Sequence, residues 1–423
     1  MTKVHIATLG CSANLADTQL MLGLLDEAGY EITESGADAD ICVVNMCSVK
    51  GEVSTLRRLK EIAPSQKLVI TGCIPSTFVP QLEQHYRDAS LLSTQNIHKI
   101  VDAVEHMETG ERLIALQKSI EPQKTGMRRI RTNPAVSIVP ILSGCDLHCT
   151  YCSVKLIKPT LISYSRASIL LEIREAVKEG CKEIWLTSMD NAVYEAEQGK
   201  LGLPSLLREI CSMPHDFKVR VGMMNPHHTL KQLHELAAAM QHPKIYQFLH
   251  LPVQSGSNRI LHLMGRRNTT QQFCHIVSAF RSVMPNITLA TDIIAGFPTE
   301  SEEDFQQTTS LLKGIKPDVV NISRYAPRPG TASLNIAPPI SSNEKKRRSK
   351  ILTELCAEIG LVRNKAWLGW SGAVTIIEQG KNNTMQGRNF AYKPVVIPGG
   401  YPLGYKVTTQ ITAATAHDLR GKI

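Results

Sequence analysis

Short apolar runs alternate with stretches of helical apolar spacing along most of this chain. Before residue 110 the apolar runs are VHIATLG, ICVVNM and KLVITG, and a further short run covers Ser90–Thr94. The helices expected between and after them are Leu15–Ala28, Ser54–Ile62, Phe78–Tyr86 and Ile97–Met107. Alternation of strands and helices in this way predicts a parallel sheet with helices on its faces. We therefore expect an α/β domain over residues 1–118.

The alternation pauses and then resumes. Gly126 and Pro134 interrupt the periodicity, so residues 119–136 are expected to form a linker. Six strand-like runs follow, with helical patterns between them: SIVPIL, EIWLTS, KVRVGM, YQFLHLPV, ITLATDIIAG and DVVNIS. They predict a second parallel α/β domain over residues 137–366. Residues 367–423 instead carry short β-rich runs broken by Gly and Pro, which suggests a small antiparallel β-barrel.

Composition narrows the class of protein. The 423 residues carry a formal net charge of +9 with a pI of about 8.9, which hints at a polyanionic partner such as nucleic acid. No apolar run is long enough to span a membrane, and the first ten residues enter a strand-like pattern rather than a signal peptide. Eleven cysteines without a secretory signal favour a reducing compartment, the cytoplasm, and favour metal ligation over disulfides.

Three cysteines stand in one short stretch directly after a strand-like run. Cys145, Cys149 and Cys152 have C-x3-C-x2-C spacing and follow Ser137–Leu142, which places them at the carboxyl end of a buried strand. A zinc site or disulfides would take an even set of cysteines. An iron–sulfur cube is held by four thiolates, so three would hold it and leave one iron open to another ligand. The alternative is three thiols in a loop, or an adventitious metal site.

A second group of cysteines is dispersed in the sequence but shares one structural setting. Cys11, Cys47 and Cys73 each follow the end of a different predicted strand in the first domain. Parallel strands share their carboxyl edge, so these side chains are expected to meet there as a second metal site. The alternative is three buried core thiols, because free cysteine is often buried. That alternative is preferred for Cys42, which lies within ICVVNM.

Other polar residues have simpler interpretations. His148, His227 and His228 are not at metal-ligand spacing and are expected to be polar loop residues. The basic residues of Arg128–Arg131 are expected to belong to a solvated linker, although they could contact phosphate. The basic run Lys345–Lys350 opens an amphipathic helix and is expected to face water rather than RNA.

The stretch SGCDLHCTYCSVK, with an aromatic residue before its third cysteine, resembles the radical S-adenosylmethionine (SAM) superfamily. The resemblance implies a partial (β/α)6 barrel, a [4Fe-4S] cluster on the three cysteines, and SAM bound to the open iron. An electron from such a cluster cleaves SAM to a 5′-deoxyadenosyl radical, and the protein orients the reactants. The residues that the resemblance assigns to SAM contacts are Tyr151, Ser188, Asp190, Gln254, Asp292 and Phe297. For each residue alone, the alternative is a cap or turn residue.

A narrower resemblance covers nearly the whole chain. LGCSANLADTQLM, VVNMCSVKG and VITGC resemble the N-terminal domain of the tRNA methylthiotransferases. In that family the matching cysteines, here Cys11, Cys47 and Cys73, hold an auxiliary [4Fe-4S] cluster that is implicated in presenting the inserted sulfur. The C-terminal region resembles the TRAM domain, an RNA-binding module. The implied RNA contacts lie in its basic, aromatic-bearing loop and are Arg388, Asn389, Tyr392 and Lys393.

The resemblance implies an enzyme that acts on the anticodon loop of tRNA. VVNMCSVKG, VRVGMMNP and EIWLTS look most like the branch that replaces the C2 hydrogen of N6-threonylcarbamoyladenosine at position 37 with a methylthio group. The implied cofactors are two [4Fe-4S] clusters and SAM, which is used both to methylate the sulfur and to supply the radical. The implied partners are tRNA and an electron donor such as flavodoxin or ferredoxin.

Three features depart from the family pattern. Ile157-Lys158-Pro159 stands where the family usually has Ala-Arg-Gly, Met189 stands where Gln or Glu is common, and the following Asn191-Ala192-Val193 is atypical. Three alternatives stay open: methylthiolation of another tRNA adenosine, methylthiolation of a ribosomal-protein aspartate, and a non-catalytic cluster-containing RNA-binding protein. The net positive charge favours RNA over the ribosomal protein.

Overall fold

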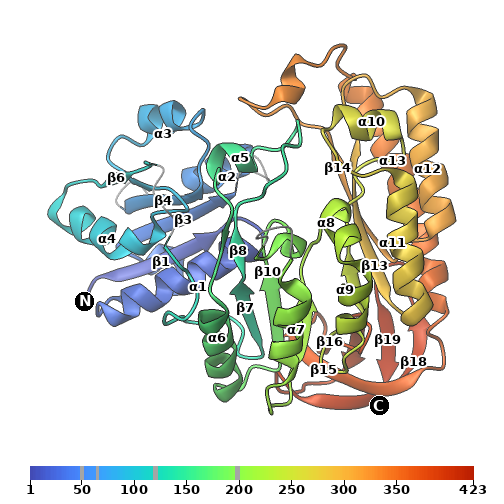
Figure 1. Cartoon of the computed structure of the whole chain (residues 1–423). Coiled ribbons are helices and arrows are strands. Elements are labelled where there is room, and N and C mark those ends of the chain that lie inside the picture. The colour runs from blue at the N-terminus through green and yellow to red at the C-terminus, as the bar shows by residue number, and fades with distance from the viewer. Residues whose placement is uncertain (48–51, 63–65, 118–121, 196–200) are drawn as a thin grey trace. The chain divides into compact units, whose positions relative to one another are not determined.

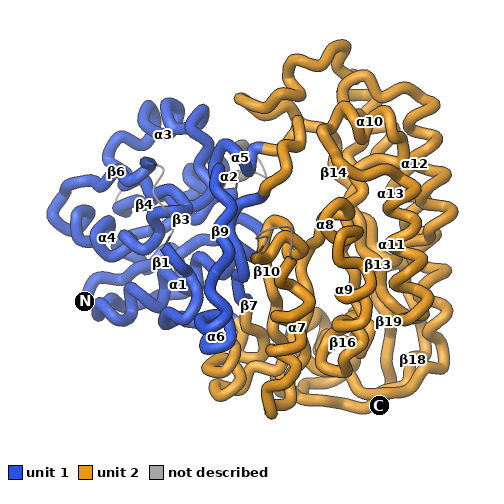
Figure 2. Tube along the Cα trace, in the orientation of Figure 1, with its two compact units in different colours: residues 1–132, 138–145, 153–172 blue, residues 133–137, 146–152, 173–423 orange. Residues whose placement is uncertain are grey.

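The computed structural model describes residues 1–47, 52–62, 66–117, 122–195 and 201–423. Their backbone contacts divide the chain into two units, which Figure 2 colours separately. The first unit comprises residues 1–132, 138–145 and 153–172, and the second comprises residues 133–137, 146–152 and 173–423. The chain therefore passes between the units more than once. Residues 119–121, at the start of the expected linker, lie outside the described residues.

A parallel sheet of six strands forms the centre of the first unit (Figure 1). Its spatial order is β2-β1-β3-β4-β5-β6, and every neighbouring pair is parallel. The strands are β1 (Lys3–Thr8), β2 (Glu31–Ile32), β3 (Ile41–Cys47), β4 (Lys67–Cys73), β5 (Ser90–Leu92) and β6 (Ile114–Ala115). The helices are α1 (Ser12–Glu27), α2 (Glu52–Lys60), α3 (Val79–His85) and α4 (Ile100–Thr109). The parallel α/β fold predicted for this region is confirmed.

Alternating side chains of the central strand β3 give each face of this sheet its own core. Ile41 and Val43 belong to an apolar cluster with residues of α1 and α4. Val44 and Met46 belong to a second cluster with residues of α2 and α3. All seven residues of β3 are buried, as expected for a central parallel strand covered on both faces. The carboxyl ends of β3 and β4 therefore extend from a sheet that has an apolar core on each face.

The six strand-like runs of the central region all appear as strands. They form two three-stranded sheets, ordered β11-β10-β7 and β12-β13-β14, and a parallel bridge between Val219 and Ile245 links β11 to the segment before β12. The strands are β7 (Val136–Pro140), β10 (Glu183–Thr187), β11 (Lys218–Val221), β12 (Phe248–His250), β13 (Thr288–Ala295) and β14 (Val319–Arg324). A short antiparallel pair, β8 (Leu142–Ser143) and β9 (Ile162–Ser163), flanks the cysteine stretch.

Helices separate these strands and complete the strand–helix alternation. They are α5 (Val154–Ile157), α6 (Arg166–Lys178), α7 (Leu203–Cys211), α8 (Pro226–Lys231), α9 (Leu233–Met240), α10 (Asn258–Leu263), α11 (Thr270–Val283) and α12 (Glu302–Ile315). In an arrangement of this kind, functional side chains gather at the carboxyl ends of the strands.

The C-terminal region is a closed β-barrel that follows the long helix α13 (Ser342–Lys365). Its strands are β15 (Ser371–Gln379), β16 (Thr384–Arg388), β17 (Pro394–Pro398), β18 (Lys406–Ala414) and β19 (Leu419–Lys422), in the order β15-β16-β17-β19-β18. Four neighbouring pairs are antiparallel, and β17 with β19 is parallel because β18 lies between them in sequence. None of the described helices, including the 24 residues of α13, is long and apolar enough to cross a membrane.

Candidate metal centres and cofactor site

The structure brings the three dispersed cysteines together at the carboxyl edge of the first unit's sheet. Cys47 ends β3 and Cys73 ends β4, and the two are direct partners in the parallel register. Their side chains therefore leave the same face of the sheet. Cys11 precedes α1, and its hydrogen bond with the Cys47 thiol is the main cause of the raised pKa of Cys11. Burial raises the pKa of Cys73 to about 11, and the nearby Cys11 thiol adds to that rise.

The donor set at this edge consists of three cysteine thiols. An iron–sulfur cube takes thiolate ligands, and three of them leave one iron open to another ligand. The donor set therefore fits an iron–sulfur cluster.

Residues 146–152 of the cysteine-bearing loop belong to the second unit and are fastened there at Thr150, between the second and third cysteines. The Thr150 amide donates to the Met264 carbonyl and the Thr150 hydroxyl donates to the Leu263 carbonyl, both at 2.9 Å. These carbonyls lie at the carboxyl end of α10. Gly265 follows with a φ of +67°, and a Cβ there would lie 2.9 Å from the His148 carbonyl oxygen. The close approach of α10 to the loop therefore requires glycine.

Arg266 places a positive charge beside the same loop. Its Nη1 donates to Cys149 Sγ at 3.8 Å, and its Nη2 donates to the Pro252 carbonyl at 2.7 Å. A cation that donates to a thiolate stabilises the thiolate form and tunes a cluster that the thiolate holds. Tyr151 lies near Arg266, with its ring 6.4 Å from the ring of Phe297 at an angle of 82°. Nothing in the run MGRRNT marks its first arginine as different from its second, so no sequence pattern indicates this contact.

His228 lies between two carboxylates. Its Nδ1 is 2.6 Å from Asp190 Oδ2, and its Nε2 is 3.0 Å from Asp146 Oδ2. Burial alone would lower the pKa of His228, but the hydrogen bonds to these two carboxylates outweigh it and raise the pKa to about 9. The two ring nitrogens point in opposite directions, so the trio is an ion-pair bridge and not a metal chelate. The expectation that His228 is a polar loop residue is wrong, because it is buried in α8.

Three of the residues expected to contact SAM, Ser188, Gln254 and Asp292, lie within or after strands of the central region. Ser188 follows β10, and its buried hydroxyl oxygen has no hydrogen-bond partner among the described residues. The Gln254 amide donates to the Asp292 carbonyl at 2.8 Å. The Asp292 carboxylate accepts from His250 at 3.0 Å and from Asn321 at 2.7 Å. An unpartnered buried hydroxyl at a strand end is a group that a polar cofactor would satisfy, so this edge fits SAM.

Asp190 and Phe297, also expected to contact SAM, are engaged by the protein itself. Asp190 Oδ1 accepts from the amides of Ala192 at 3.1 Å and Asn225 at 2.8 Å, while its other oxygen binds the imidazole of α8. Phe297 is fully buried and packs 5.4 Å from the ring of Tyr325. Neither residue offers an exposed polar atom or ring face to a cofactor in this structure.

Three family models match the chain in the order of its structural regions. An uncharacterized protein family, UPF0004, matches residues 3–93, the Radical SAM superfamily matches residues 139–312, and the TRAM domain matches residues 373–423. A probable threonylcarbamoyladenosine tRNA methylthiotransferase of Pyrococcus horikoshii is 40% identical over 405 residues, which cover 95% of this chain and 94% of the relative. This chain belongs to the threonylcarbamoyladenosine tRNA methylthiotransferase family. Family members of Danio rerio and Mus musculus are 34% and 33% identical, over 100% and 99% of this chain and 78% and 74% of theirs.

Solved structures of other radical SAM proteins share the fold of this family member. The methyltransferase TsrM from Kitasatospora setae, with cobalamin and a [4Fe-4S] cluster bound, aligns with a TM-score of 0.57 at 13% identity, over 79% of this chain and 74% of that chain. The cobalamin-dependent enzyme OxsB with aqua-cobalamin bound aligns with a TM-score of 0.51 at 14% identity, over 84% of this chain and 56% of that chain. These alignments confirm the radical SAM fold class predicted from the sequence.

In this family member, three of the four residues expected to bind RNA are internal. Asn389, Tyr392 and Lys393 are 1%, 8% and 3% exposed. Lys393 Nζ donates to Asp318 Oδ1 and to Asn364 Oδ1, both at 2.7 Å. The expectation that these three residues contact RNA is corrected, because protein partners already cover them. The Lys393 side chain attaches the TRAM barrel to the residue before β14 and to the end of α13.

Arg388, the fourth residue of that set, is only half-buried. Its guanidinium lies 4.6 Å from the centre of the Tyr392 ring, and that of Arg220 lies 5.4 Å from the same ring. The Tyr392 ring in turn packs 4.9 Å from the rings of Tyr246 and Phe248. Two cations and three aromatic rings therefore join the TRAM barrel to β11 and β12. An RNA contact by Arg388 stays a prediction.

Two basic runs expected to face solvent each contain a buried arginine. Arg129 pairs with Glu172 of α6 at 2.8 Å, and both side chains are buried. Arg348 of α13 pairs with Glu300 at 2.7 Å, and these side chains are also buried. A guanidinium out of water needs an acceptor, so each pair forms only when its two segments are packed together. The solvated interpretation is wrong for these two arginines.

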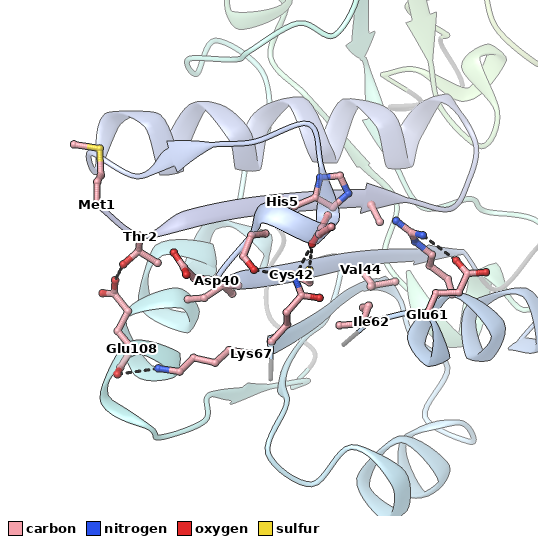
Figure 3. A pocket seen from close by; sticks show the side chains of 17 residues that line it. Met1, Thr2, His5, Asp40, Cys42, Val44, Glu61, Ile62, Lys67 and Glu108 are labelled. Atoms are coloured by element: carbon pink, nitrogen blue, oxygen red, sulfur yellow. Dashed lines mark hydrogen bonds and ion pairs between the residues drawn. The ribbon is translucent and has the colours of Figure 1, made fainter. Parts of the chain in front are cut away.

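A cavity of about 1080 Å³ opens on the first unit's sheet, and Figure 3 shows the side chains that line it. Its lining includes His5 of β1, Cys42 and Val44 of β3, and Lys67 of β4. Side chains alternate along a strand, so Cys42 faces this cavity while Cys47 leaves the opposite face. Cys42 is buried in the core, as expected. Its thiol lies on the opposite face of the sheet from the candidate metal site.

Proposed function

We propose that this chain is a tRNA methylthiotransferase that replaces the C2 hydrogen of N6-threonylcarbamoyladenosine at position 37 with a methylthio group. The observation that carries the proposal is the 40% identity over 95% of the chain to a relative named for this nucleoside. The match spans the N-terminal sheet, the radical SAM region and most of the TRAM barrel. The six cysteines at strand ends supply the ligands that such chemistry needs.

The barrel cysteines Cys145, Cys149 and Cys152 would hold the cluster that binds SAM. Together, cluster and SAM supply a radical able to remove hydrogen from a carbon that is not acidic enough for acid–base chemistry. Two residues of this chain would support the cluster and SAM. Arg266 donates to Cys149, and Ser188 offers a hydroxyl without a partner among the described residues at the end of β10. Both residues act by binding and orientation.

Cys11, Cys47 and Cys73 would hold the auxiliary cluster, whose part in this family is to present the sulfur. Burial raises the pKa of Cys73, and the ammonium group of Lys158 opposes that rise. Lys158 keeps the positive charge at the middle position of the stretch where the family usually has Ala-Arg-Gly. A cation at this edge favours thiolates and an anionic sulfur species over their neutral forms.

The proposal includes two partners and a cellular location. The substrate is the anticodon loop of a tRNA, which the net charge of +9 and the TRAM match over residues 373–423 support. The electron comes from a carrier such as flavodoxin or ferredoxin. The place is the cytoplasm, where tRNA is modified and thiols stay reduced.

The test is a nucleoside analysis. Anaerobically reconstituted protein is incubated with SAM, a reductant and tRNA that carries N6-threonylcarbamoyladenosine, and the digested tRNA is examined by mass spectrometry. The 2-methylthio derivative is expected with this tRNA, and not with a protein carrying Cys145→Ala, Cys149→Ala and Cys152→Ala. Methylthiolation of a different adenosine, or none despite reductive SAM cleavage, would contradict the assigned substrate. Comparing tRNA from cells with and without the gene gives the same answer in vivo.

A further inference from the structure

Two buried asparagines lie between the turns that carry the dispersed cysteines. Asn14 is in the first turn of α1 and is 2% exposed, and Asn45 is in β3 and is 0% exposed. Asn14 Nδ2 donates to Asn45 Oδ1 at 3.0 Å, and Asn45 Nδ2 donates to the Asn14 carbonyl at 2.8 Å. This reciprocal pair ties the start of α1 to the carboxyl end of β3.

Each of the three residues that immediately precede a ligand cysteine contacts this pair. A Cβ on Gly10 would lie 2.5 Å from Asn14 Oδ1, so only glycine fits there. The Met46 carbonyl accepts from Asn14 Nδ2 at 2.9 Å. Gly72 has a φ of +99°, and a Cβ on it would lie 2.3 Å from Asn45 Oδ1. The asparagine pair is thus the common neighbour of three turns that are far apart in the sequence.

We propose that Asn14 and Asn45 are positioning residues that set the spacing of the Cys11, Cys47 and Cys73 thiols, and with it the geometry of the cluster they hold. The Cys11 thiol donates to Asn14 Oδ1 at 3.4 Å, so one thiol is oriented directly. The other two are placed through the main chain that precedes them. This inference rests on the proposed function, because it takes the three thiols to be cluster ligands.

The amide side chain suits this position because it donates and accepts at the same time. Asn45 Nδ2 also donates to Thr18 Oγ1 at 3.0 Å, so its donor group serves two acceptors. An aspartate has the same shape, but its ionised form only accepts. Asn14→Asp would lose the donations to Asn45 and Met46 and would place a carboxylate against the Asn45 amide oxygen. Removing such an outer partner of a metal ligand typically weakens metal binding by about 10- to 100-fold.

Asn96 provides a matched control within the same unit. It is 4% exposed, and its Nδ2 donates to Ser93 Oγ at 2.9 Å and to the carbonyls of Ala115 and Gln117, both at 3.0 Å. These contacts join the segment after β5 to β6 and include none of the turns that precede the cysteines. Asn96→Asp therefore disturbs a buried amide network whose partners named here lie outside the Asn14–Asn45 pair.

The experiment uses the full chain with Cys145, Cys149 and Cys152 replaced by Ala, so that bound iron reports only the auxiliary site. Asn14→Asp and Asn96→Asp are each introduced into this parent. The rate of iron loss to a chelator and the electron paramagnetic resonance spectrum of the reduced cluster are then measured anaerobically, with circular dichroism to check folding.

Asn14→Asp is expected to speed iron loss by about tenfold or more and to change the spectrum, while Asn96→Asp keeps both at the parent values. Parent-like iron loss and spectrum in Asn14→Asp would overturn the inference. A parent that binds no iron would instead overturn the cluster assignment, and with it the proposed function. If Asn14→Asp does not fold, the smaller neutral pair Asn14→Ser and Asn96→Ser is compared by the same criteria.

Discussion

The imidazole of His228 bridges two carboxylates from different segments of the second unit. Asp146 belongs to the cysteine-bearing loop, and Asp190 follows β10. Two carboxylates so close together repel each other, and a protonated imidazole between them replaces that repulsion with two charge-assisted hydrogen bonds. Asp146 directly follows the first cysteine of the loop in sequence. The bridge therefore fixes one end of this loop to α8.

His228→Gln is expected to destabilise the second unit by about 3 kcal/mol near neutral pH, because the buried Asp190 and the half-buried Asp146 lose the positive charge between them. The pKa of His228 is raised to about 9, above its value in an unfolded chain. Its stabilising contribution is therefore full below about pH 6.5 and is lost as the pH rises through about 9. The difference between wild type and variant should shrink over that range, as measured by urea unfolding of anaerobic protein.

His227→Gln is the control for this prediction. The His227 ring lies 5.1 Å from that of His228, but burial lowers the pKa of His227. It is therefore neutral near pH 7, and its replacement is expected to change stability by less than about 0.5 kcal/mol. A difference between wild type and His228→Gln that does not vary with pH would show that the charged bridge is not the source of the effect.

Sequence patterns do not indicate long-range side-chain contacts such as those of His228. The six cysteines were predicted as ligands because their spacing, or their position after a strand, repeats. The partners of His228 lie 38 and 82 residues away, and Arg266 reaches Cys149 across 117 residues. Single long-range pairs leave no periodic signal in the sequence, so only the folded chain shows them.

Elements with a long buried face were predictable, and short edge elements were not. Strands β3 and β4 each have seven residues and read as continuous apolar runs because the sheet is covered on both faces. The edge strands β2 and β6 have two residues each, which is too short for any pattern. The prediction that the loop between β16 and β17 contacts RNA failed for another reason. Its basic and aromatic residues match an RNA surface in composition, but its lysine is paired with Asp318, 75 residues away.

Lys393→Met is expected to destabilise the attachment of the TRAM barrel by about 3 kcal/mol, because the buried Asp318 loses the Lys393 ammonium group and keeps its ion pair with Arg363. The slope of tRNA affinity against salt concentration should not change. A lysine that contacts phosphate would instead lower that slope by about one on removal. Urea unfolding and tRNA binding at several salt concentrations measure the two effects.

The exposed Lys422, at the end of β19, is the matched control. Lys422→Met is expected to change the free energy of unfolding by less than about 0.5 kcal/mol. A lower salt slope in Lys393→Met without loss of stability would restore this residue as an RNA contact. Point variants are preferable to removal of residues 367–423, since that deletion would also strip Asp318 and the aromatic rings of β12 of their partners.

The whole molecule carries two cysteine sets that are built in different ways. Cys11, Cys47 and Cys73 come together only when β1, β3 and β4 have formed their parallel sheet. The other set lies within eight consecutive residues, and its loop is fastened by α10. Since different elements support the two sets, loss of one set should leave the other able to bind its cluster. This independence makes their separate contributions to the reaction measurable.

The reconstituted chain is expected to bind about eight irons, and a variant with Cys11, Cys47 and Cys73 replaced by Ala about four. That variant should still release 5′-deoxyadenosine from SAM but form no methylthio nucleoside, because the sulfur-presenting cluster is absent while the radical source remains. Both products are measured by mass spectrometry.

Cys42→Ala, at a thiol on the other face of β3, should keep all the iron and both activities. A folded triple variant that loses both activities while keeping four irons would mean that the N-terminal cysteines serve SAM cleavage as well. A triple variant that keeps both activities would mean that the inserted sulfur reaches the base by another route.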